Sequence, residues 1–380
     1  MVFDRAVIEM DKRADRLYSW LKTEKLAREK ASWVKKRVKL INNGYQGTSQ
    51  EYRDTVIAYW KKYGLKPKRY WFANYCNGLD AYDPRYLPDT VYYRMILPYF
   101  NDISMRKAYT DKCMYRFLLH GVEMPDTIVK NIAGYYYNGD KNEIISFEDA
   151  KRICEKEDHL IFKPSINSGR GKRIEFYDRG RNDVGALFSS FRKDFVVQRI
   201  VSQHPDLARI NQTSLNTIRV VTFRFKNDVH VLSTILRMGS SGSRIDNISA
   251  GGISCVIRPD GRLAEKAVTR KAVWTDKHPS GIAFKDIVVP NMHDVVESAK
   301  QLHLQLPYFD LIGWDFAVRD DGAPVFIEYN VMPEPNQVSC GPTFGNLTDE
   351  VLDEVFLKNS KRRSPLTVPL MKQFERIFGI

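Results

Sequence analysis

Residues 313–333 read GWDFAVRDDGAPVFIEYNVMP, two apolar stretches joined by an Asp-Gly pair at 321–322. An Asp-Gly pair between two such stretches is a strong signal for a β-hairpin. Counting inward from this turn sets Asp315 of the first strand opposite Glu328 of the second. The sequence therefore predicts a hairpin in which two carboxylates face each other between strongly apolar neighbours.

Two carboxylates directly opposite each other across a strand pair repel, so this arrangement needs an explanation. Asn330 lies two positions after Glu328, and their side chains therefore share one face of the strand. Asp315, Glu328 and Asn330 all offer hard oxygen ligands, which suit Mg²⁺, and a divalent cation turns the repulsion into attraction. The alternative is a pair of acids on a solvent-facing side of the hairpin. The apolar flanks and the third oxygen ligand favour the metal site.

The composition is that of a globular protein, with 43% hydrophobic and 28% charged residues over 380 positions. This length suggests roughly two or three domains. No run reaches about 18 consecutive apolar residues, so no membrane span is expected, and the N-terminus has no apolar core of a secretory signal. Five scattered cysteines without a CxxC spacing argue for a reduced, cytoplasmic protein and against a zinc site.

The formal net charge of +13 indicates an anionic partner or substrate. Much of the excess lies within residues 12–39, where a Lys- and Arg-rich stretch carries a broken apolar stripe. Such a helix can lie on an anionic membrane, which would place the protein peripherally at the inner face of that membrane. The commoner alternative is a helix that packs on the protein body and exposes a basic face to solvent. No nucleic-acid partner is expected.

The apolar patterning predicts an α+β protein dominated by antiparallel strands rather than a regular βαβ alternation. Most of residues 1–41 and 50–63 read as helix, and a helix at 105–120 stops at Gly121. From residue 159 onward strands dominate, and further helices are expected at 147–157, 292–305, 347–358 and 365–378.

The stretch LIFKPSINSGRGKRIEFY, residues 160–177, joins two expected strands through a loop rich in Gly and Ser. The first strand ends at Lys163, and the loop brings glycines whose backbone N–H groups can approach an anion closely. The spacing is not that of a P-loop. The loop is therefore either a phosphate-binding element or simply a mobile hairpin.

Arginines interrupt two otherwise apolar strands, Arg219 in SLNTIRVVTFRF and Arg237 in VLSTILRMG. A buried arginine is rarely left unpaired. The pair indicates either a structural ion pair or an anion clamp, since a guanidinium fits a carboxylate or phosphate with two parallel hydrogen bonds. Asn247 and the Gly251-Gly252 pair that follow are consistent with close approach of the backbone to a ligand.

In this order the motifs resemble those of the ATP-grasp family. That family has a helix with a basic residue, a Lys-Pro strand with a Gly-rich lid loop, an adenine hinge, two Arg-bearing strands and an Asp…Glu-x-Asn metal site. The stretch DKCMYRFLLHGVEMP, residues 111–125, is similar to the family's DKxxxK/R helix. It places Arg116 where a basic phosphate contact is expected, with Lys112 as a second candidate.

The resemblance implies a role for each motif residue. Lys163 matches the strand lysine that reaches the α- and β-phosphates, and Arg219 and Arg237 match positions that hold the γ-phosphate or an acyl phosphate. The remaining matches are the lid residues Ser168, Gly169, Gly171 and Lys172, the hinge residues Gln198, Arg199 and Ile200, the loop residue Asn247, and the Mg²⁺ ligands Asp315, Glu328 and Asn330.

More narrowly, NTIRVVTF and IGWDFAV…FIEYNVMPEPNQ look like a branch described as sugar-transfer-associated ATP-grasp proteins, which is linked with surface-polysaccharide pathways. The implied fold is the ATP-grasp fold, in which two α+β subdomains with antiparallel sheets clasp ATP. We expect these subdomains at residues 105–200 and 201–380, after a helical, aromatic-rich N-terminal region at 1–104.

The function that the resemblance implies is an ATP- and Mg²⁺-dependent, ADP-forming ligase. It would join a small-molecule or glycan carboxylate, such as an acidic sugar or an amino acid, to an amine through an acyl phosphate. A kinase that phosphorylates a hydroxyl needs the same ATP half-site, so the sequence leaves this alternative open. A third hypothesis is a basic module without catalysis that binds membrane or nucleic acid through residues 12–39.

Overall fold

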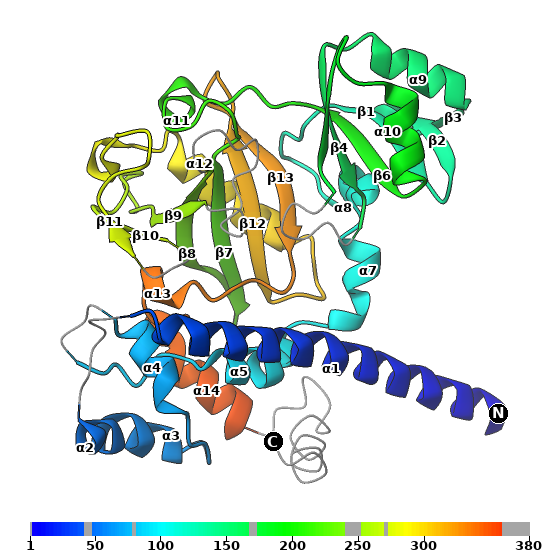
Figure 1. Ribbon diagram of the computed structural model, residues 1–380. Helices are drawn as coiled ribbons and strands as arrows, with labels where there is room; N and C mark the ends of the chain where they lie inside the picture. Colours follow the sequence, from blue (N-terminus) through cyan, green and yellow to red (C-terminus); the bar gives the residue numbers. More distant parts are fainter. Residues whose placement is uncertain are drawn as a thin grey trace. The chain divides into compact units, whose positions relative to one another are not determined.

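The computed structural model describes residues 2–41, 48–77, 81–166, 173–239, 252–269 and 273–358 (Figure 1). The chain divides into two compact units. Among the described residues, no helix combines the length and the apolar character needed to cross a bilayer. Unit 1 comprises Met1–Ser104, Tyr308–Leu311 and Met332–Ile380, and unit 2 comprises Met105–Pro307 and Ile312–Val331.

Unit 1 is helical, as the sequence predicts for residues 1–41 and 50–63. Its first element is the long helix α1, and short helices and π-helical turns follow. The elements are α1 Val2–Val38, α2 Ser49–Tyr52, π Arg53–Ile57, α3 Ala58–Lys61, α4 Arg69–Tyr75, α5 Asp89–Val91, π Tyr92–Ile96, α6 Leu97–Phe100, the 3₁₀ turn Ile103–Met105 at the boundary with unit 2, α13 Gln337–Cys340, 3₁₀ Gly345–Leu347 and α14 Thr348–Phe356.

Aromatic side chains fill the core of unit 1. Trp60, Trp71 and Tyr92 are almost completely buried. The rings of Tyr75 and Tyr86 stack with centroids 5.4 Å apart. Large rings bury much apolar surface for few residues, which suits a unit built from short helices.

Unit 2 begins with a six-stranded sheet in the order β3-β2-β1-β6-β4-β5, in which every neighbouring pair is antiparallel. Helices α9 and α10 cover one face of it (Figure 1), and their Cys154 and Phe188 pack with Phe162 and Val197 of the strands. The elements are β1 Thr127–Ile132, β2 Tyr135–Asn138, 3₁₀ Gly139–Lys141, β3 Glu143–Ile145, α9 Phe147–Glu155, β4 His159–Pro164, β5 Glu175–Asp178, α10 Val184–Phe191 and β6 Phe195–Arg199.

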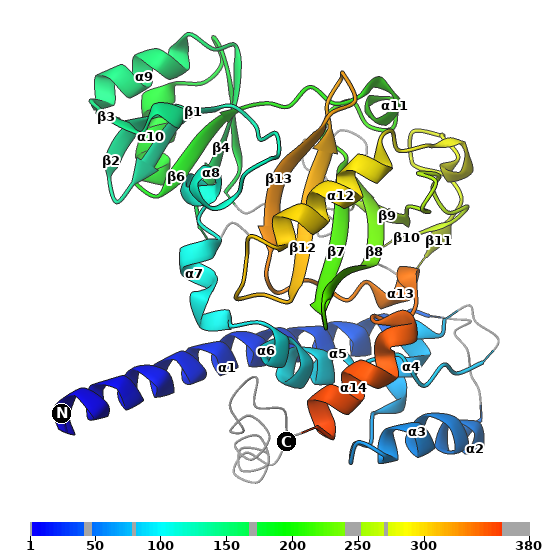
Figure 2. The same ribbon diagram turned by 180° about the vertical axis from the view of Figure 1, so that it is seen from behind.

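The second sheet of unit 2 has seven strands in the order β11-β10-β9-β8-β7-β12-β13. Helix α12 packs on one face of it, across β7 and β8 (Figure 2). The elements are α11 Pro205–Ala208, β7 Thr217–Phe225, β8 Asp228–Met238, β9 Ile253–Val256, β10 Ala267–Thr269, β11 Trp274–Thr275, 3₁₀ Phe284–Asp286, α12 Met292–His303, β12 Leu311–Val318 and β13 Pro324–Asn330.

The hairpin of β12 and β13 confirms the central pair of the sequence analysis, because Asp315 lies opposite Glu328. The pairs nearer the turn differ from a simple count, which sets residue 317 opposite 326. In the structure Phe316 lies opposite Phe326, and the register shifts between residues 315 and 316. Ile327 is therefore the extra residue of a β-bulge, and the bulge restores the expected pairing at the acids.

The expected helix at 105–120 is wrong as a single element. The structure breaks it into α7 Arg106–Tyr109, a 3₁₀ turn Lys112–Met114 and α8 Tyr115–Leu118. The Asp111 side chain accepts a hydrogen bond from the Cys113 amide, and the Lys112 amide donates to the Ser165 carbonyl instead of continuing a helix. Helices near 147–157, 292–305 and 347–358 are confirmed, and the expected helix at 365–378 lies outside the described residues.

A buried polar bridge joins the seven-stranded sheet to α12. Trp314 Nε1 donates to Thr222 Oγ1 at 2.7 Å, and His303 Nδ1 lies 2.6 Å from the same oxygen. All three residues are buried. Because Trp314 directly precedes Asp315 on β12, this bridge fixes the strand that carries the acid.

Thr222→Val removes the hydroxyl but keeps the volume, so both partners lose their shared hydrogen-bonding atom. We expect the free energy of unfolding to fall by about 2–3 kcal/mol, the cost of unsatisfied buried polar groups. Thr222→Ser keeps the hydroxyl and should cost about 1 kcal/mol for the lost methyl group. Urea denaturation measures both values, and an equal or larger loss in the serine variant would contradict the bridge.

Candidate functional site

A carboxylate held by two guanidinium groups forms the centre of the seven-stranded sheet. Arg219 donates to Asp315 through Nε at 2.5 Å and Nη2 at 2.7 Å. Arg237 Nη1 lies 3.1 Å from each oxygen of the same carboxylate. The strand register explains the convergence, because Arg237 pairs with Thr217, two positions before Arg219 on the same face of β7.

The electrostatics of Asp315 follow from this geometry. The side chain is only 5% exposed. Burial alone would raise the pKa of Asp315, but the charges of Arg219 and Arg237 and their hydrogen bonds outweigh it and lower the pKa below its usual value. Asp315 is therefore ionised at neutral pH, and the two arginines, which are also largely buried, depend on its charge.

The second carboxylate of the hairpin is neutralised by a different cation. Lys112 Nζ lies 3.0 Å from Glu328 Oε2, and the Glu328 side chain remains 37% exposed. Burial raises the pKa of Glu328 and so does Asp315, but Lys112 and Lys163 more than offset both, and the pKa falls below its usual value. The two opposed acids are thus both ionised, each next to its own positive charge.

The broken helical segment determines where Lys112 lies. Its backbone amide is hydrogen bonded to Ser165 at the end of β4. The Tyr115 ring, one turn later, packs edge-on against Phe326 at 5.4 Å and against Tyr329 at 5.2 Å on β13. A continuous helix would not make these contacts with both sheets, so the break at 110–111 is what brings Lys112 to Glu328.

The six-stranded sheet contributes a second pair of polar residues. Lys163 follows the core residue Phe162, so its side chain lies on the face opposite α9 and α10. Its ammonium group donates to Gln198 Oε1 at 3.2 Å. Lys163 also lowers the pKa of Glu328, so a cation of the six-stranded sheet acts electrostatically on an acid of the seven-stranded sheet.

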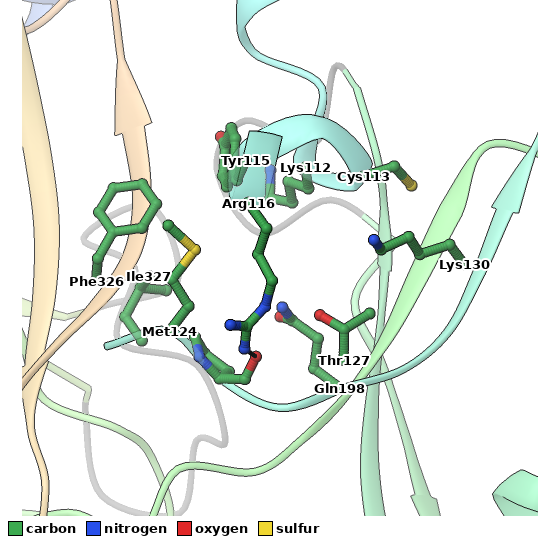
Figure 3. A pocket seen from close by; sticks show the side chains of 11 residues that line it. Lys112, Cys113, Tyr115, Arg116, Met124, Thr127, Lys130, Gln198, Phe326 and Ile327 are labelled. Carbon is green, nitrogen blue, oxygen red and sulfur yellow. Dashed lines mark hydrogen bonds between the residues drawn. The ribbon is translucent and has the colours of Figure 1, made fainter. Parts of the chain in front are cut away.

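A narrow recess lies beside these residues (Figure 3). The Arg116 side chain extends along it toward Gln198 and Thr127, and Lys112 lines the same recess. Arg116 Nη2 is 3.5 Å from the Pro125 carbonyl, a long and weak contact. Arg116 and Lys112 of one motif and Gln198 of another therefore line one recess.

One cation of this recess, Lys130 in β1, was not predicted from the sequence. Lys130 is buried, donates to Asn142 Oδ1 at 2.9 Å and lies 5.6 Å from the Phe117 ring. It shares a row with Val196 and Lys163 across the sheet. The signal was present, because TIVKNI places a lysine in an apolar stretch just as TIRVV and TILRM place arginines.

Some expected site residues lie elsewhere or outside the described part of the chain. The Arg199 side chain points to the surface, where it pairs with Glu157 at 2.7 Å and Asp126 at 2.9 Å. Ile200 is exposed. Ser168, Gly169, Gly171, Lys172 and Asn247 lie outside the described residues.

The donor set at the hairpin fits a Mg²⁺ ion that is completed by other ligands. Glu328 and Asn330 share one face of β13, opposite Asp315 and Gly313. Within the described residues no group of three or more His, Cys, Asp or Glu side chains could hold a metal. Two carboxylates and an amide oxygen are a typical protein contribution to a Mg²⁺ site whose other ligands are phosphates and water.

Asp315→Asn removes the charge on which two buried guanidinium groups depend. We expect the free energy of unfolding to fall by about 3 kcal/mol or more. Glu328→Gln, at a partly exposed pair, should cost about 1 kcal/mol. Asp321→Asn, which breaks the exposed pair with Arg319, should leave the free energy of unfolding nearly unchanged. Equal losses in all three variants, measured by urea denaturation, would contradict the buried cluster.

One family model and several solved structures are similar to this chain. The family model described as sugar-transfer associated ATP-grasp matches residues 153–339. No curated protein matches the chain. Among solved structures the chain is similar to the ATP-grasp ligase PsnB complexed with precursor peptide PsnA2 and AMPPNP, at 13% identity and a TM-score of 0.37 over 67% of this chain and 62% of that chain.

A second similar structure is the D-alanine–D-alanine ligase from Bacillus anthracis complexed with ATP, at 15% identity and a TM-score of 0.37 over 70% of this chain and 68% of that chain. The chain thus spans less than two thirds of the length of PsnB. The matched segment contains Lys163, both arginines and the Asp315–Glu328 pair. Residues 153–339 therefore belong to the sugar-transfer associated ATP-grasp family.

Proposed function

We propose that the protein is an ATP- and Mg²⁺-dependent ligase that joins a carboxylate to an amine and forms ADP. The observation that carries this proposal is the pair of opposed, ionised acids, Asp315 and Glu328, surrounded by Arg219, Arg237 and Lys112. A site that must hold a metal–triphosphate needs both signs of charge close together. The family match of residues 153–339 supports the same function.

The proposed reaction has two steps. An oxygen of the substrate carboxylate attacks the γ-phosphorus, so a C–O–P linkage forms and the bond from the γ-phosphorus to ADP breaks. The amine then attacks the acyl carbon, the C–N bond forms, and phosphate leaves while the amine proton passes to solvent. Both steps need positioning and charge stabilisation rather than a covalent bond to the protein.

The residues divide into groups by their proposed roles. Lys163, Arg116 and Lys112 neutralise phosphate oxygens, and Arg219 and Arg237 stabilise the negative charge that develops on the transferring phosphoryl group and on the tetrahedral oxyanion. The further roles are phosphate cover by Ser168, Gly169, Gly171 and Lys172, adenine contact through the backbone of Gln198, Arg199 and Ile200, acceptor-side contact by Asn247, and Mg²⁺ ligation by Asp315, Glu328 and Asn330.

Mg²⁺ bound there would supply positive charge to the β- and γ-phosphates. The structure favours Glu328 as the more accessible ligand. The Glu328 side chain is 37% exposed, whereas the Asp315 side chain is 5% exposed and is bonded to guanidinium nitrogens through both oxygens. Lys112 can also move from Glu328 to a phosphate oxygen when Mg²⁺ binds, because its ammonium group is a point charge on a flexible stem.

The substrate that we propose is an acidic sugar, a glycan or an amino acid in surface-polysaccharide biosynthesis. The net charge of +13 favours anionic substrates. The description of the matching family as sugar-transfer associated supports the same class.

The experiment is ATP turnover against a panel of acids and amines, with mass spectrometry of the products. We expect ADP and phosphate in step with an amide product that requires both substrates. Lys163→Met and Glu328→Gln should each lower kcat by about 100-fold, since each removes charge from the phosphoryl-transfer site. Arg319→Ala, at an exposed ion pair beside the hairpin turn just after the end of β12, should retain full activity.

The products also distinguish the competing reactions. A stable phosphorylated product that forms without any amine would identify a kinase. AMP and pyrophosphate instead of ADP and phosphate would contradict the acyl-phosphate route.

We propose in addition that α1 contacts an anionic membrane surface. The structure reduces the number of basic residues available for such a contact, because Arg13 and Arg16 are both ion-paired with Glu9. Arg28 is paired with Glu24, but exposed basic side chains follow at positions 35 and 36 in the last turn of the helix and at position 39 just after it. Exposed Leu21 and Leu40 flank them, which adds apolar groups to the basic stripe.

Sedimentation with vesicles tests this contact. We expect binding to vesicles that contain phosphatidylglycerol and none to phosphatidylcholine alone, with loss of binding at high salt. Replacing Lys35, Lys36 and Lys39 together by Glu should abolish binding. The matched control replaces Lys61, Lys66 and Lys68, which are also exposed in unit 1, by Glu. The proposal would be contradicted if both triple variants lost vesicle binding equally, or if the protein bound DNA and not vesicles.

A further inference from the structure

Arg37, near the end of α1 in unit 1, is a buried cation of a different kind. Its side chain is part of the core, with the residue only 5% exposed. The guanidinium carbon lies 5.0 Å from the centre of the Trp33 ring, which covers one side of the group. Within the described residues, neither Nε nor Nη2 of Arg37 has a hydrogen-bond partner.

These two nitrogens are the ones that bind a carboxylate side-on, with two parallel hydrogen bonds. The chain uses the same pair repeatedly. Nε and Nη2 together hold a carboxylate in Arg219 with Asp315, Arg85 with Asp83, Arg94 with Glu24, Arg199 with Glu157 and Arg319 with Asp321. Arg37 presents the same two donors, in a more buried position, without an anion.

The acids of this part of unit 1 are engaged elsewhere. Asp89 accepts a hydrogen bond from the Tyr75 hydroxyl at 2.7 Å, and Glu334 pairs with Lys30 at 2.8 Å. The phenol of Tyr75 interacts electrostatically with Arg37. No described carboxylate therefore takes the place opposite the two donors of Arg37.

A second polar group without a partner lies on the helix packed against α1. Helix α4 lies next to the C-terminal end of α1 in both views (Figures 1 and 2), and the two helices are in contact. Asn74 of α4 is 1% exposed, and neither its Nδ2 nor its Oδ1 has a hydrogen-bond partner within the described residues. Asn74 directly precedes Tyr75, the residue that interacts with Arg37.

An uncompensated buried charge is strongly unfavourable, and buried charges are normally paired. Burial lowers the pKa of Arg37 to about 10, so the side chain still carries its charge at neutral pH. Neutralisation by loss of the proton is therefore not the solution. The charge can instead be compensated by an anion whose two oxygens match the spacing of Nε and Nη2.

We propose that Arg37 and the unpartnered Asn74 of the contacting helix α4 form a binding site for a small oxyanion, a phosphate or a carboxylate, at the junction of α1 and α4. Such a ligand accepts from Nε and Nη2 of Arg37 together, and the Asn74 amide supplies a further donor. The site belongs to unit 1, whereas the proposed ATP site consists of unit 2 residues. The inference therefore does not depend on the proposed ligase activity.

Thermal unfolding without nucleotide tests the site. The full chain is heated in Tris chloride with increasing inorganic phosphate, and sodium chloride keeps the ionic strength constant. We expect a saturable rise in Tm of at least about 2 °C, because a ligand that binds only the folded state stabilises it. A parallel series with acetate shows whether the site also takes carboxylates.

Arg37→Met gives the decisive comparison, because it replaces the buried charge by an apolar side chain of similar length. In chloride alone this variant should melt above the wild type, since it removes an unpaired buried charge. In saturating phosphate its Tm should not rise, so its advantage over the wild type shrinks or reverses. Arg37→Lys keeps the charge but loses the two-pronged donor pair, and its response to phosphate should be smaller.

Two controls separate this site from other phosphate-binding groups. Arg85→Met removes an exposed, already paired arginine of the same unit and should keep the full phosphate response. Lys163→Met removes a phosphate contact of the proposed ATP site and should keep the part of the response that depends on Arg37. The proposal is wrong if phosphate and acetate both leave the wild-type Tm unchanged, if Arg37→Met responds like the wild type, or if Arg37→Met melts lower in chloride alone.

Discussion

The Asp315 carboxylate between two guanidinium groups is the interaction on which the rest of unit 2 depends. Arg219, Arg237 and Asp315 come from three strands, and each is largely buried. A slip of one residue in any of these strands would turn its charged side chain to the opposite face, against α12, and leave the others unpaired. The buried charges therefore specify the register of the sheet, while the apolar residues of the other face supply most of its burial.

The β-bulge at Ile327 explains how two acids come to share one place. Near the turn the hairpin follows the register that pairs Phe316 with Phe326, and that register alone would not set Glu328 opposite Asp315. The extra residue restores the pairing, and the repulsion is then offset by separate cations. Asp315 is fixed by two rigid guanidinium groups, and Glu328 by the single ammonium of Lys112. Asp315 is thus held by hydrogen bonds to both of its oxygens, whereas Glu328 remains partly exposed.

The sequence was sufficient where a local pattern determines the geometry. The Asp-Gly turn and the apolar alternation predicted that Asp315 lies opposite Glu328, and the interrupted apolar strands indicated that Arg219 and Arg237 each bind an anionic group. The choice between an anion clamp and an ion pair was beyond the sequence, because it depends on which strands are neighbours. The ion pair of Lys112 with Glu328 was also not predicted. It requires the expected helix to break, and the break results from capping by the Asp111 side chain. Lys130 was overlooked because its short strand was not recognised.

The cations that give the chain its net charge are found in three different situations. The arginines on β7 and β8 are buried with a carboxylate that they share. The lysines along the second half of α1 are exposed, and water screens them at little cost. Arg37 is buried as deeply as the first group but lacks the anion, within the described residues. The residue is almost excluded from solvent, and no described carboxylate pairs with it, so of the three situations it is the one for which we propose a bound anion.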